Sequence, residues 1–316
     1  MKLYFAPLEG ITTYIYRNTH ERFFGGCDAY FTPFITPSDN EKIGRKGFRD
    51  ILPENNTADI RVQVLTNNPA SFLKFEKKAA EYGYRELNIN LGCPSGTVVG
   101  KGRGSGLLKN TDALDKFLYE IFSQTNAKIS VKTRAGYFGV DEIEELLSIY
   151  NKYPISLFIL HPRCREDFYK GIPSQKAFLY TYENAKAPLC YNGNILSAED
   201  YADKALRYDA LDSIMIGRGA VANPAIFREI KGGNSLTTDE LIAFTEALKE
   251  NYSQILDSDV FTLHKLKEIW LYIMENFPDE KKILKTIRKT NNLCEFISAI
   301  HSLPKMKKKD NKHADF

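Results

Sequence analysis

The stretch Asn88-Ile89-Asn90-Leu91-Gly92-Cys93-Pro94-Ser95 decides how this chain of 316 residues folds and what it can do. Its first four residues alternate in the manner of a β-strand, and a Gly-Cys-Pro turn follows directly. A glycine-rich segment over residues 100–106 comes next, where the backbone must approach something closely or move over it. A cysteine buried for structure alone rarely has such neighbours. The pattern therefore predicts a thiol that meets a substrate at the C-terminal end of a strand.

Other short, β-rich apolar runs resemble the one at residues 86–91, and they recur about every 25 to 40 residues, the length of one strand-turn-helix unit. They lie at residues 3–8, 29–35, 60–65, 128–133, 157–161, 188–192 and 212–217, with helical patterns between them at residues 68–82, 111–124, 141–153 and 197–208. Eight such alternations predict the α/β class, as a closed (β/α)8 TIM barrel. An open doubly wound sheet is the alternative, but the first run ends in Ala6-Pro7-Leu8-Glu9-Gly10, which lacks a dinucleotide-binding fingerprint.

The strand signal stops after Gly232-Gly233-Asn234. Helical apolar stripes follow at residues 238–256, 262–276, 280–291 and 294–301. We therefore expect a catalytic barrel over residues 1–235, a small all-helical domain over residues 236–303, and a disordered basic tail over residues 304–316. The alternative for the second part is a set of extra helices that only cap the barrel.

Composition excludes several classes of protein. The hydrophobic fraction of 43% and the charged fraction of 26% are typical of globular chains. The five cysteines include no C-x-x-C pair, so we expect reduced thiols, no disulfide and no metal site. No apolar run reaches membrane-spanning length, and residues 1–5 enter the first run without a signal peptide. We therefore expect a cytoplasmic protein, and we take it to be a monomer.

Basic residues gather in two places although the formal net charge is only +3. The usual interpretation of such clusters is a solvated face or tail. The first cluster follows the second strand, at the rim of the barrel mouth, and Lys101 and Arg103 lie in the loop after Cys93, so these positions favour contact with RNA phosphates. The clusters comprise Lys42, Arg45, Lys46 and Arg49, and Lys305, Lys307, Lys308 and Lys309.

Polar residues stand at nearly every expected strand end, where barrels of this class carry their chemistry. Asn192-Gly193-Asn194 and Gly217-Arg218-Gly219 follow the last two strands and predict a phosphate site made of backbone N–H groups and a guanidinium. Gln63, Lys132 and His161 suit a flat heteroaromatic ring, because they offer an amide for a pyrimidine edge, a cation for N1 of a reduced flavin and a ring donor. Alone, His161 is also consistent with an interior histidine, and Lys132 with an ion pair.

Together these stretches resemble the tRNA-dihydrouridine synthases, flavoproteins that reduce uridine in tRNA. The likeness covers roughly residues 1–303, and the Gly-Cys-Pro element with its glycine-rich loop is the most specific piece. The matching stretches are Ala6-Pro7-Leu8-Glu9-Gly10, Val62-Gln63-Val64, Leu87-Asn88-Ile89-Asn90-Leu91-Gly92-Cys93-Pro94, Val131-Lys132-Thr133-Arg134, His161-Pro162-Arg163, Asn192-Gly193-Asn194 and Ile216-Gly217-Arg218-Gly219.

The resemblance implies an FMN-binding barrel, a helical domain that helps to hold tRNA, and NADPH as the electron donor. It implies that Cys93 is the proton donor and that Asn90 and Arg134 contact the target uracil. It further implies that FMN is lined by Pro7, Gln63, Lys132, His161, Asn192, Gly193, Asn194, Gly217 and Arg218.

This sequence departs from the family pattern at three points. Leu8 stands where methionine is common, which preserves an apolar side chain. His161-Pro162-Arg163-Cys164 replaces the more usual His-Gly-Arg-Thr, and the proline removes a backbone donor. Asn194 replaces a frequent acidic residue. None of these changes touches the thiol.

The chemistry of uracil reduction fits the same residues. Reduction of the 5,6 bond needs a hydride at C6, which reduced FMN supplies, and a proton at C5. Asn90 and Arg134 are candidate donors to the negative charge that develops on the O4 side. A thiol with an ordinary pKa of about 8.5 is largely protonated near neutral pH, so we expect Cys93 to act as an acid and not as a nucleophile.

Two other functions fit parts of the pattern. A flavin barrel that acts on a small free pyrimidine, such as a dihydroorotate dehydrogenase, also uses a mobile loop and an Asn-rich mouth. The second alternative is a barrel without catalytic activity that serves as an RNA-binding or folding factor. The helical domain and the cations at the rim favour RNA as the partner.

Overall fold

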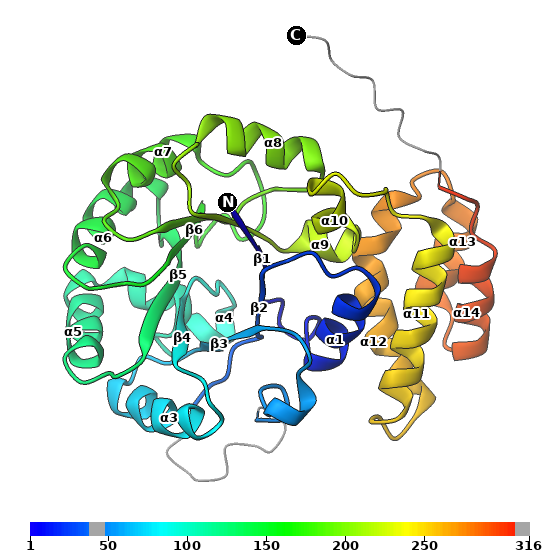
Figure 1. The fold of residues 1–316 in the computed structure, drawn as a ribbon, viewed down its shortest axis with the longest axis horizontal. Helices are drawn as coiled ribbons and strands as arrows, with labels where there is room; N and C mark the ends of the chain where they lie inside the picture. Colours follow the sequence, from blue (N-terminus) through cyan, green and yellow to red (C-terminus); the bar gives the residue numbers. More distant parts are fainter. Residues whose placement is uncertain (38–47, 307–316) are drawn as a thin grey trace. The chain divides into compact units, whose positions relative to one another are not determined.

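Eight parallel strands close into a barrel in the order of the chain, and β1 pairs with both β2 and β8 (Figure 1). The structure, a computed structural model, describes residues 1–37 and 48–306. Its strands are β1 (Lys2–Phe5), β2 (Ala29–Phe31), β3 (Ile60–Val64), β4 (Glu86–Leu91), β5 (Lys128–Gly136), β6 (Phe158–Cys164), β7 (Leu189–Tyr191) and β8 (Ser213–Ile216). Each of the eight predicted runs overlaps one of these strands, so the prediction of a TIM barrel is confirmed.

Helices connect successive strands and pack around the barrel (Figure 1). They are α1 (Tyr14–Phe23), α3 (Pro69–Glu81), α4 (Gly96–Val99), α5 (Thr111–Phe122), α6 (Ile143–Tyr150), α7 (Gln175–Asn184) and α8 (Ala198–Arg207). Side-chain caps explain where two of them begin, since Asn68 accepts from the N–H of Ser71 in α3 and Asn110 accepts from the N–H of Ala113 in α5. No helix within residues 1–37 and 48–306 is long and apolar enough to cross a membrane.

The interior of the barrel has an apolar side and a polar side. The apolar side is a cluster formed by Tyr4, Ala6, Ala29, Phe31, Leu157, Ile159, Cys190 and Met215. On the polar side, Gln63 of β3, Asn88 of β4 and Ser130 of β5 are ladder partners, and all three are fully buried. Buried amides and hydroxyls are costly without hydrogen bonds, so this side must carry a connected polar network.

Strands β5 and β6 extend furthest, and a register shift marks their C-terminal ends. Arg134 pairs with His161, whereas Gly136 pairs with Cys164. Pro162 lies between the two β6 residues and has no N–H to give to the ladder, so the shift falls where a regular ladder would lose a hydrogen bond. The two strands thereby carry polar side chains to the mouth of the barrel.

The C-terminal helices form a second compact unit, together with residues Asn18–Gly26 and Leu196–Ala198. Its core surrounds Trp270, whose ring lies edge-on to Phe296 with centroids 6.3 Å apart and whose Nε1 donates to Thr245 Oγ1 at 3.3 Å. The helices of this unit are α9 (Arg218–Ala222), α10 (Ile226–Ile230), α11 (Thr238–Ser253), α12 (Asp259–Ile273), α13 (Lys281–Lys289) and α14 (Leu293–His301).

The division between the two units falls after Gly217, whereas the sequence placed a domain boundary near residue 236. Helix α9 packs against α12, and Asn276 Nδ2 donates to the carbonyl of Ala222 at 2.6 Å. These contacts join residues far apart in the chain, so local sequence patterns assigned α9 and α10 to the barrel instead.

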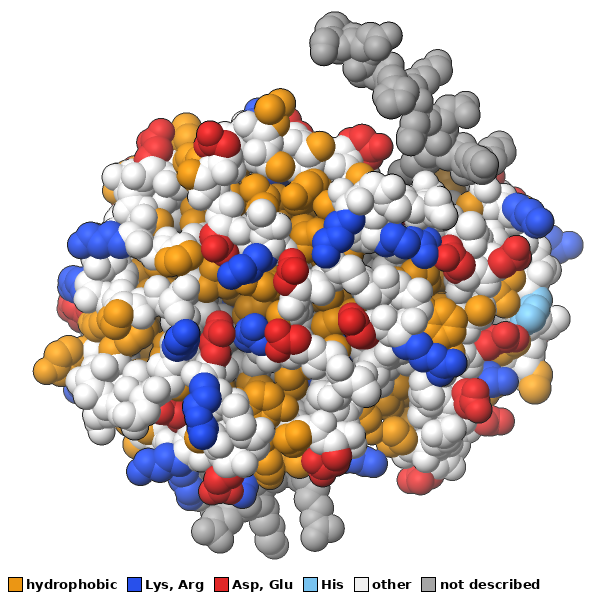
Figure 2. All heavy atoms as spheres, in the orientation of Figure 1, with side chains coloured by type: hydrophobic (Ala, Val, Ile, Leu, Met, Phe, Trp, Pro, Cys, Tyr) orange, Lys and Arg blue, Asp and Glu red, His pale blue; other side chains and the backbone are white. Residues whose placement is uncertain are grey.

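Acidic and basic side chains are interspersed on the surface. On the face shown in Figure 2, blue and red groups alternate, in keeping with the small net charge. Exposed ion pairs such as Lys176–Asp141 and Arg207–Asp203 contribute little to stability, because water and salt screen them.

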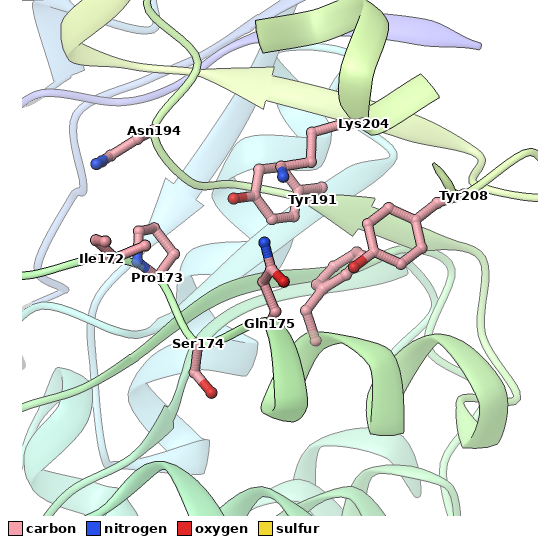
Figure 3. Close-up of a pocket in the computed structure, with 9 residues that line it drawn as sticks. Ile172, Pro173, Ser174, Gln175, Tyr191, Asn194, Lys204 and Tyr208 are labelled. Carbon is pink, nitrogen blue, oxygen red and sulfur yellow. The ribbon is translucent and has the colours of Figure 1, made fainter. Parts of the chain in front are cut away.

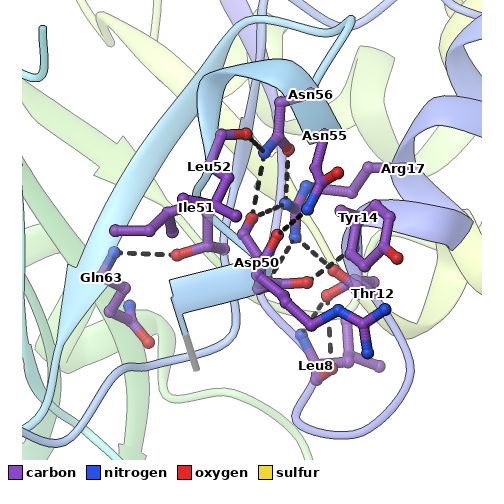
Figure 4. A network of polar contacts seen from close by, with 12 residues as sticks. Leu8, Thr12, Tyr14, Arg17, Asp50, Ile51, Leu52, Asn55, Asn56 and Gln63 are labelled. Carbon is purple, nitrogen blue, oxygen red and sulfur yellow. Dashed lines mark hydrogen bonds and ion pairs between the residues drawn. The ribbon is translucent and has the colours of Figure 1, made fainter. Parts of the chain in front are cut away.

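One ion pair of the barrel unit is different, because its arginine is fully buried (Figure 4). Arg17 Nη1 donates to Asp50 Oδ2 at 2.9 Å and to the carbonyl of Thr12 at 2.8 Å. Its Nη2 donates to the carbonyl of Asp50 and to Asn56 Oδ1, both at 2.7 Å. The carboxylate also accepts from the N–H of Tyr14. This network fastens the turn after β1 to the segment before β3.

Asp50→Ala should lower the free energy of unfolding by about 3 kcal/mol, because it leaves the buried Arg17 guanidinium without its counter-charge. Urea unfolding measures the change. The matched control is Asp141→Ala, which removes the exposed pair with Lys176 and should cost less than about 1 kcal/mol. Equal effects of the two substitutions would contradict a special role for the Arg17 network.

Candidate active site

The turn that carries Cys93 is held by the side chain of Asn90, at the end of β4. Asn90 Oδ1 accepts from the backbone N–H groups of Gly92 and Cys93, each at 3.0 Å. A side-chain oxygen that bonds two following N–H groups fixes a turn in one conformation. The thiol, which is half-buried, therefore has a defined place at the C-terminal end of β4.

A chain of amide hydrogen bonds holds Asn90 in turn. Asn90 Nδ2 donates to Gln63 Oε1 at 2.8 Å, and Gln63 Nε2 donates to Asn88 Oδ1 at 2.7 Å. Asn88 Nδ2 then donates to Ser130 Oγ at 3.0 Å. The chain crosses β3, β4 and β5 inside the barrel, and each member fixes the orientation of the next. Gln63, predicted as a flavin contact, thus also supports the cysteine turn.

The glycine-rich segment folds back against Cys93. Gly104 has φ +57°, and a Cβ there would come within 2.9 Å of the Cys93 carbonyl oxygen and 3.1 Å of Cys93 Cβ. The same carbonyl accepts from the N–H and the hydroxyl of Ser105, at 3.1 and 2.8 Å. Only glycine satisfies both the backbone conformation and the close approach. In this loop Lys101 is exposed and Arg103 is half-buried.

Two cations from β5 lie near the thiol. Arg134 is almost fully buried, and it donates from Nε to the carbonyl of Gly92 at 2.8 Å and from Nη1 to the carbonyl of Cys164 at 2.9 Å. Lys132 forms no hydrogen bond or ion pair within the described part of the chain, and burial lowers its pKa to about 8. A half-buried lysine without a counter-charge is costly, which is typical of a site for an anionic ligand.

His161 is held by protein groups on both sides of its ring. Its Nδ1 lies 2.6 Å from the carbonyl of Asn192, so this nitrogen carries the proton, and Nε2 accepts from Arg163 Nη1 at 3.2 Å. Burial and the nearby cations Arg134 and Lys132 hold the pKa of His161 well below its usual value, so the ring is neutral. The ring donor expected from the sequence is therefore already engaged with the loop after β7.

The expected phosphate loop follows β7 directly. Asn192 Nδ2 donates to the carbonyl of Met215 at 2.9 Å, which ties this loop to β8. Any Cβ at Gly193 would overlap the ring of Tyr191, so the loop depends on glycine there. Asn194 lines a pocket beside the loop with Tyr191 and Lys204 (Figure 3).

The remaining predicted cofactor residues lie at the ends of β1 and β8. Pro7 follows β1, and a Cβ at Gly217 would meet Ala6 at 3.3 Å, so these two strand ends approach closely. Arg218 is the first residue of α9. Of the basic cluster after β2, Lys42, Arg45 and Lys46 lie outside the described residues, as do Lys307, Lys308 and Lys309.

The environment of Cys93 favours the protonated thiol. Burial raises its pKa above the ordinary value, and this effect exceeds the opposing influence of the Ser95 backbone, Arg134 and Lys132. A raised thiol pKa is unsuited to a nucleophile and suited to a proton donor. Within residues 1–37 and 48–306, no group of three or more His, Cys, Asp or Glu side chains is arranged to hold a metal ion.

Sequence reasoning missed Arg163 and Asn88. Arg163 is nearly fully buried and binds the carbonyls of Lys170 and Gly171 as well as the His161 ring. The signal was available, because residues two apart in a strand share a face. Arg163 follows His161 by two positions, and Asn88 precedes Asn90 by two.

The chain matches a known protein family and several of its members. The family model "Dihydrouridine synthase (Dus)" matches residues 4–308. A relative from Bacillus subtilis (strain 168), "Probable tRNA-dihydrouridine synthase 2", is 31% identical over an alignment of 266 residues that covers 79% of this chain and 78% of the relative. The tRNA-dihydrouridine(16) synthase of Shigella flexneri is 24% identical over an alignment of 317 residues that covers 96% of this chain and 98% of the relative.

Solved structures resemble the barrel at low sequence identity. The old yellow enzyme homologue from Zymomonas mobilis has a TM-score of 0.52 and 11% identity, covering 74% of this chain and 90% of its own. A mutant of morphinone reductase in complex with tetrahydroNAD has a TM-score of 0.51 and 9% identity, covering 74% of this chain and 87% of its own. These similarities show the fold alone.

Alkylation of Cys93 by iodoacetamide should reach its half-maximal rate at a higher pH than alkylation of a solvent-exposed model thiol, because burial raises the Cys93 pKa. Mass spectrometry of the Cys93 peptide measures the rate across pH. Lys132→Met removes a cation that lowers this pKa, so it should move the profile to still higher pH. A Cys93 profile at or below that of the model thiol would contradict the description of the site.

Proposed function

The chain belongs to the dihydrouridine synthase family, whose members reduce uridine in tRNA, and we propose that it does so with FMN, NADPH and the Cys93 thiol as proton donor. The observation that supports this proposal most strongly is the Cys93 turn. It holds a protonated thiol at the barrel mouth, close to the buried Arg134 and the half-buried Lys132.

The residues of the mouth fit a flavin mononucleotide. Lys132 is half-buried and has no ion-pair partner in the described residues, which suits the negative charge of a reduced isoalloxazine near N1. Gly193 and Gly217 stand in the same turns after β7 and β8, packed against Tyr191 and Ala6, and Asn192, Asn194 and Arg218 add polar groups there. Pro7, Gln63 and His161 complete the proposed lining. When bound, FMN supplies the hydride for C6 of uracil, after reduction by NADPH.

Asn90 and Arg134 are the proposed contacts to the target uracil. Asn90 uses one amide hydrogen for Gln63 and retains the other, while Arg134 uses Nε and Nη1 for backbone carbonyls. Their orientation is thus fixed by protein bonds before a substrate arrives. Pre-oriented donors stabilise charge that develops on the O4 side of the ring at little cost in reorganisation.

Cys93 supplies the proton for C5. Its raised pKa keeps the thiol protonated through the neutral range, and activity that depends on the thiol form falls as the pH rises through that pKa. The thiolate that remains after transfer lies near Arg134 and Lys132, whose positive charges stabilise it. Solvent then returns the proton.

The proposed tRNA contacts lie in both units. Lys101 and Arg103 stand in the loop that covers the Cys93 turn, and Arg49 is exposed before β3. In the helical unit, α13 places every charged side chain on its exposed side and Leu284 and Ile287 on its buried side; the charged residues are Lys281, Lys282, Lys285, Arg288 and Lys289.

Helix α13 carries charges of one sign on its exposed side, which supports an anionic partner. Lys281 and Lys282 lie in the first turn, directly after the N-cap residue Glu280, and no acidic residue lies within that turn. Lys281, Lys285 and Lys289 repeat at a spacing of four residues, which brings like charges together. We propose that α13 binds tRNA phosphates, a cluster that the sequence analysis did not identify.

The relatives distinguish between the alternative functions that the sequence left open. Those matched over most of their length are named for tRNA-dihydrouridine synthesis, so neither a free pyrimidine substrate nor an idle barrel is retained. We propose a cytoplasmic monomer, and sedimentation of the purified protein tests the monomeric state.

Cys93→Ala should retain bound FMN and its reduction by NADPH, but uridine reduction in tRNA should fall at least about 100-fold, because the proton donor is lost. Stopped-flow absorbance follows the reductive half-reaction, and mass spectrometry of digested tRNA measures dihydrouridine. Cys294→Ala is the control, because Cys294 is exposed on α14 and should leave both rates unchanged. Full turnover of tRNA by Cys93→Ala would refute the acid role.

The double substitution Lys281→Gln, Lys285→Gln should weaken tRNA binding and reduce the salt dependence of the affinity, with a slope smaller by about 2, because two phosphate contacts are lost. Filter binding across KCl concentrations measures both quantities. Lys265→Gln on α12 is the control, since Lys265 is paired with Glu268. An unchanged slope in the double variant would remove α13 from the RNA-binding surface.

A further inference from the structure

Exposed aromatic side chains stand in the loops that follow β5 and β6, at the end of the barrel that carries Cys93. Phe138 is 69% exposed and Phe168 is 41% exposed. Strand β5 ends at Gly136 and β6 at Cys164, so both phenyl rings belong to the rim of the mouth. Large apolar groups in such a position bury no core surface, and exposed groups of this kind indicate a binding surface.

Two cations lie over aromatic rings of these loops, namely Phe168 and the buried Tyr137. Arg165 Cζ lies 4.9 Å from the ring centroid of Phe168 and 5.5 Å from that of Tyr137, between the two loops. Lys109 Nζ lies 4.4 Å from the Tyr137 centroid, and the rings of Tyr137 and Phe138 are in edge contact at 4.7 Å. The rim therefore presents flat apolar rings with positive charge between them, the composition of single-stranded nucleic acid sites.

Arg165 is only partly satisfied by the protein. Its Nη1 donates to Glu166 Oε1 at 2.8 Å, but its buried Nε has no hydrogen-bond partner in the structure. The guanidinium is thus held by its contacts with the two rings and by one ion pair. A planar cation held in this way can extend an aromatic stack toward a nucleobase.

The backbone of Phe168 adopts an unfavourable conformation while its side chain is exposed. It has φ +51°, the left-handed conformation that disfavours bulky residues, and within residues 1–37 and 48–306 every other residue with positive φ is glycine. Asp167 Oδ2 accepts from the N–H of Cys164 at 2.8 Å, and the N–H of Phe168 donates to the carbonyl of Arg165 at 3.1 Å, which holds the loop in this form. A strained residue at a functional rim suggests that its side chain is used there.

We propose that Phe138 and Phe168, with Arg165 between the loops, form a stacking platform for the unpaired nucleobases that flank the target uridine. The inference rests on the proposed function of the same mouth. A uridine that enters the barrel leaves its neighbours in the chain at the rim, where they have lost their stacking partners. The phenyl rings at the rim restore that stacking, whereas Lys101 and Arg103 bind the phosphates of the RNA.

The test separates stacking from charge. Phe138→Ala and Phe168→Ala should each weaken tRNA binding by about tenfold, with no change in the slope of log affinity against log salt, because no phosphate contact is lost. Lys101→Gln should reduce that slope instead. Phe168→Tyr, which retains a stacking ring, should restore affinity, and Tyr119→Ala, on the exposed side of α5, is the matched control.

A second readout locates the base. A short RNA with 2-aminopurine next to the target uridine should lose fluorescence on binding the wild-type protein and retain it with the Phe138→Ala, Phe168→Ala double variant. If wild-type protein reduces tRNA while both alanine variants bind as tightly as wild type and quench equally, the platform is refuted and the proposed function stands. If wild-type protein neither binds nor reduces tRNA, the proposed function itself fails. NADPH-dependent flavin reduction should be the same in all variants.

Discussion

The amide of Asn90 is the constraint on which the site depends. Its oxygen fixes the Cys93 turn through two backbone N–H groups, and its nitrogen joins the turn to Gln63 and, through Asn88, to Ser130 on β5. The chain of bonds is buried, so breaking one link leaves the next group without a partner. Local geometry at one thiol is in this way tied to three neighbouring strands.

The division of the barrel interior explains why these polar groups can be buried at all. One side is packed with apolar residues from β1, β2, β6, β7 and β8, and this side adds to the hydrophobic stabilisation. The other side of the barrel interior carries amide and cationic side chains. Lys132 and Arg134 cost stability there, and both lower the pKa of Cys93, although burial of the thiol outweighs them. The resulting site is positively charged, yet its thiol stays protonated.

The sequence was sufficient for the barrel and for the placement of most mouth residues, because strand period and strand-end position are local properties. It identified Cys93, Asn90 and Lys132 at strand ends that the structure brings together. It did not predict that both ring nitrogens of His161 form hydrogen bonds, with the Asn192 carbonyl and with Arg163, because tertiary contacts determine those partners. The same reason explains the shift of the unit boundary to Gly217, because the contact between α9 and α12 joins distant segments.

The most direct test of this account compares hydrogen exchange of the Gly92 and Cys93 backbone amides in Asn90→Asp and Asn90→Ala. Aspartate keeps the oxygen that accepts from Gly92 and Cys93, whereas alanine removes it, and both variants lose the donor to Gln63 and to the proposed uracil contact. If the side chain holds the turn, both amides stay protected in Asn90→Asp and exchange at least about tenfold faster in Asn90→Ala. Wild-type protection in Asn90→Ala, or an equal loss of protection in both variants, would contradict the claim that this side chain acts by holding the thiol in place.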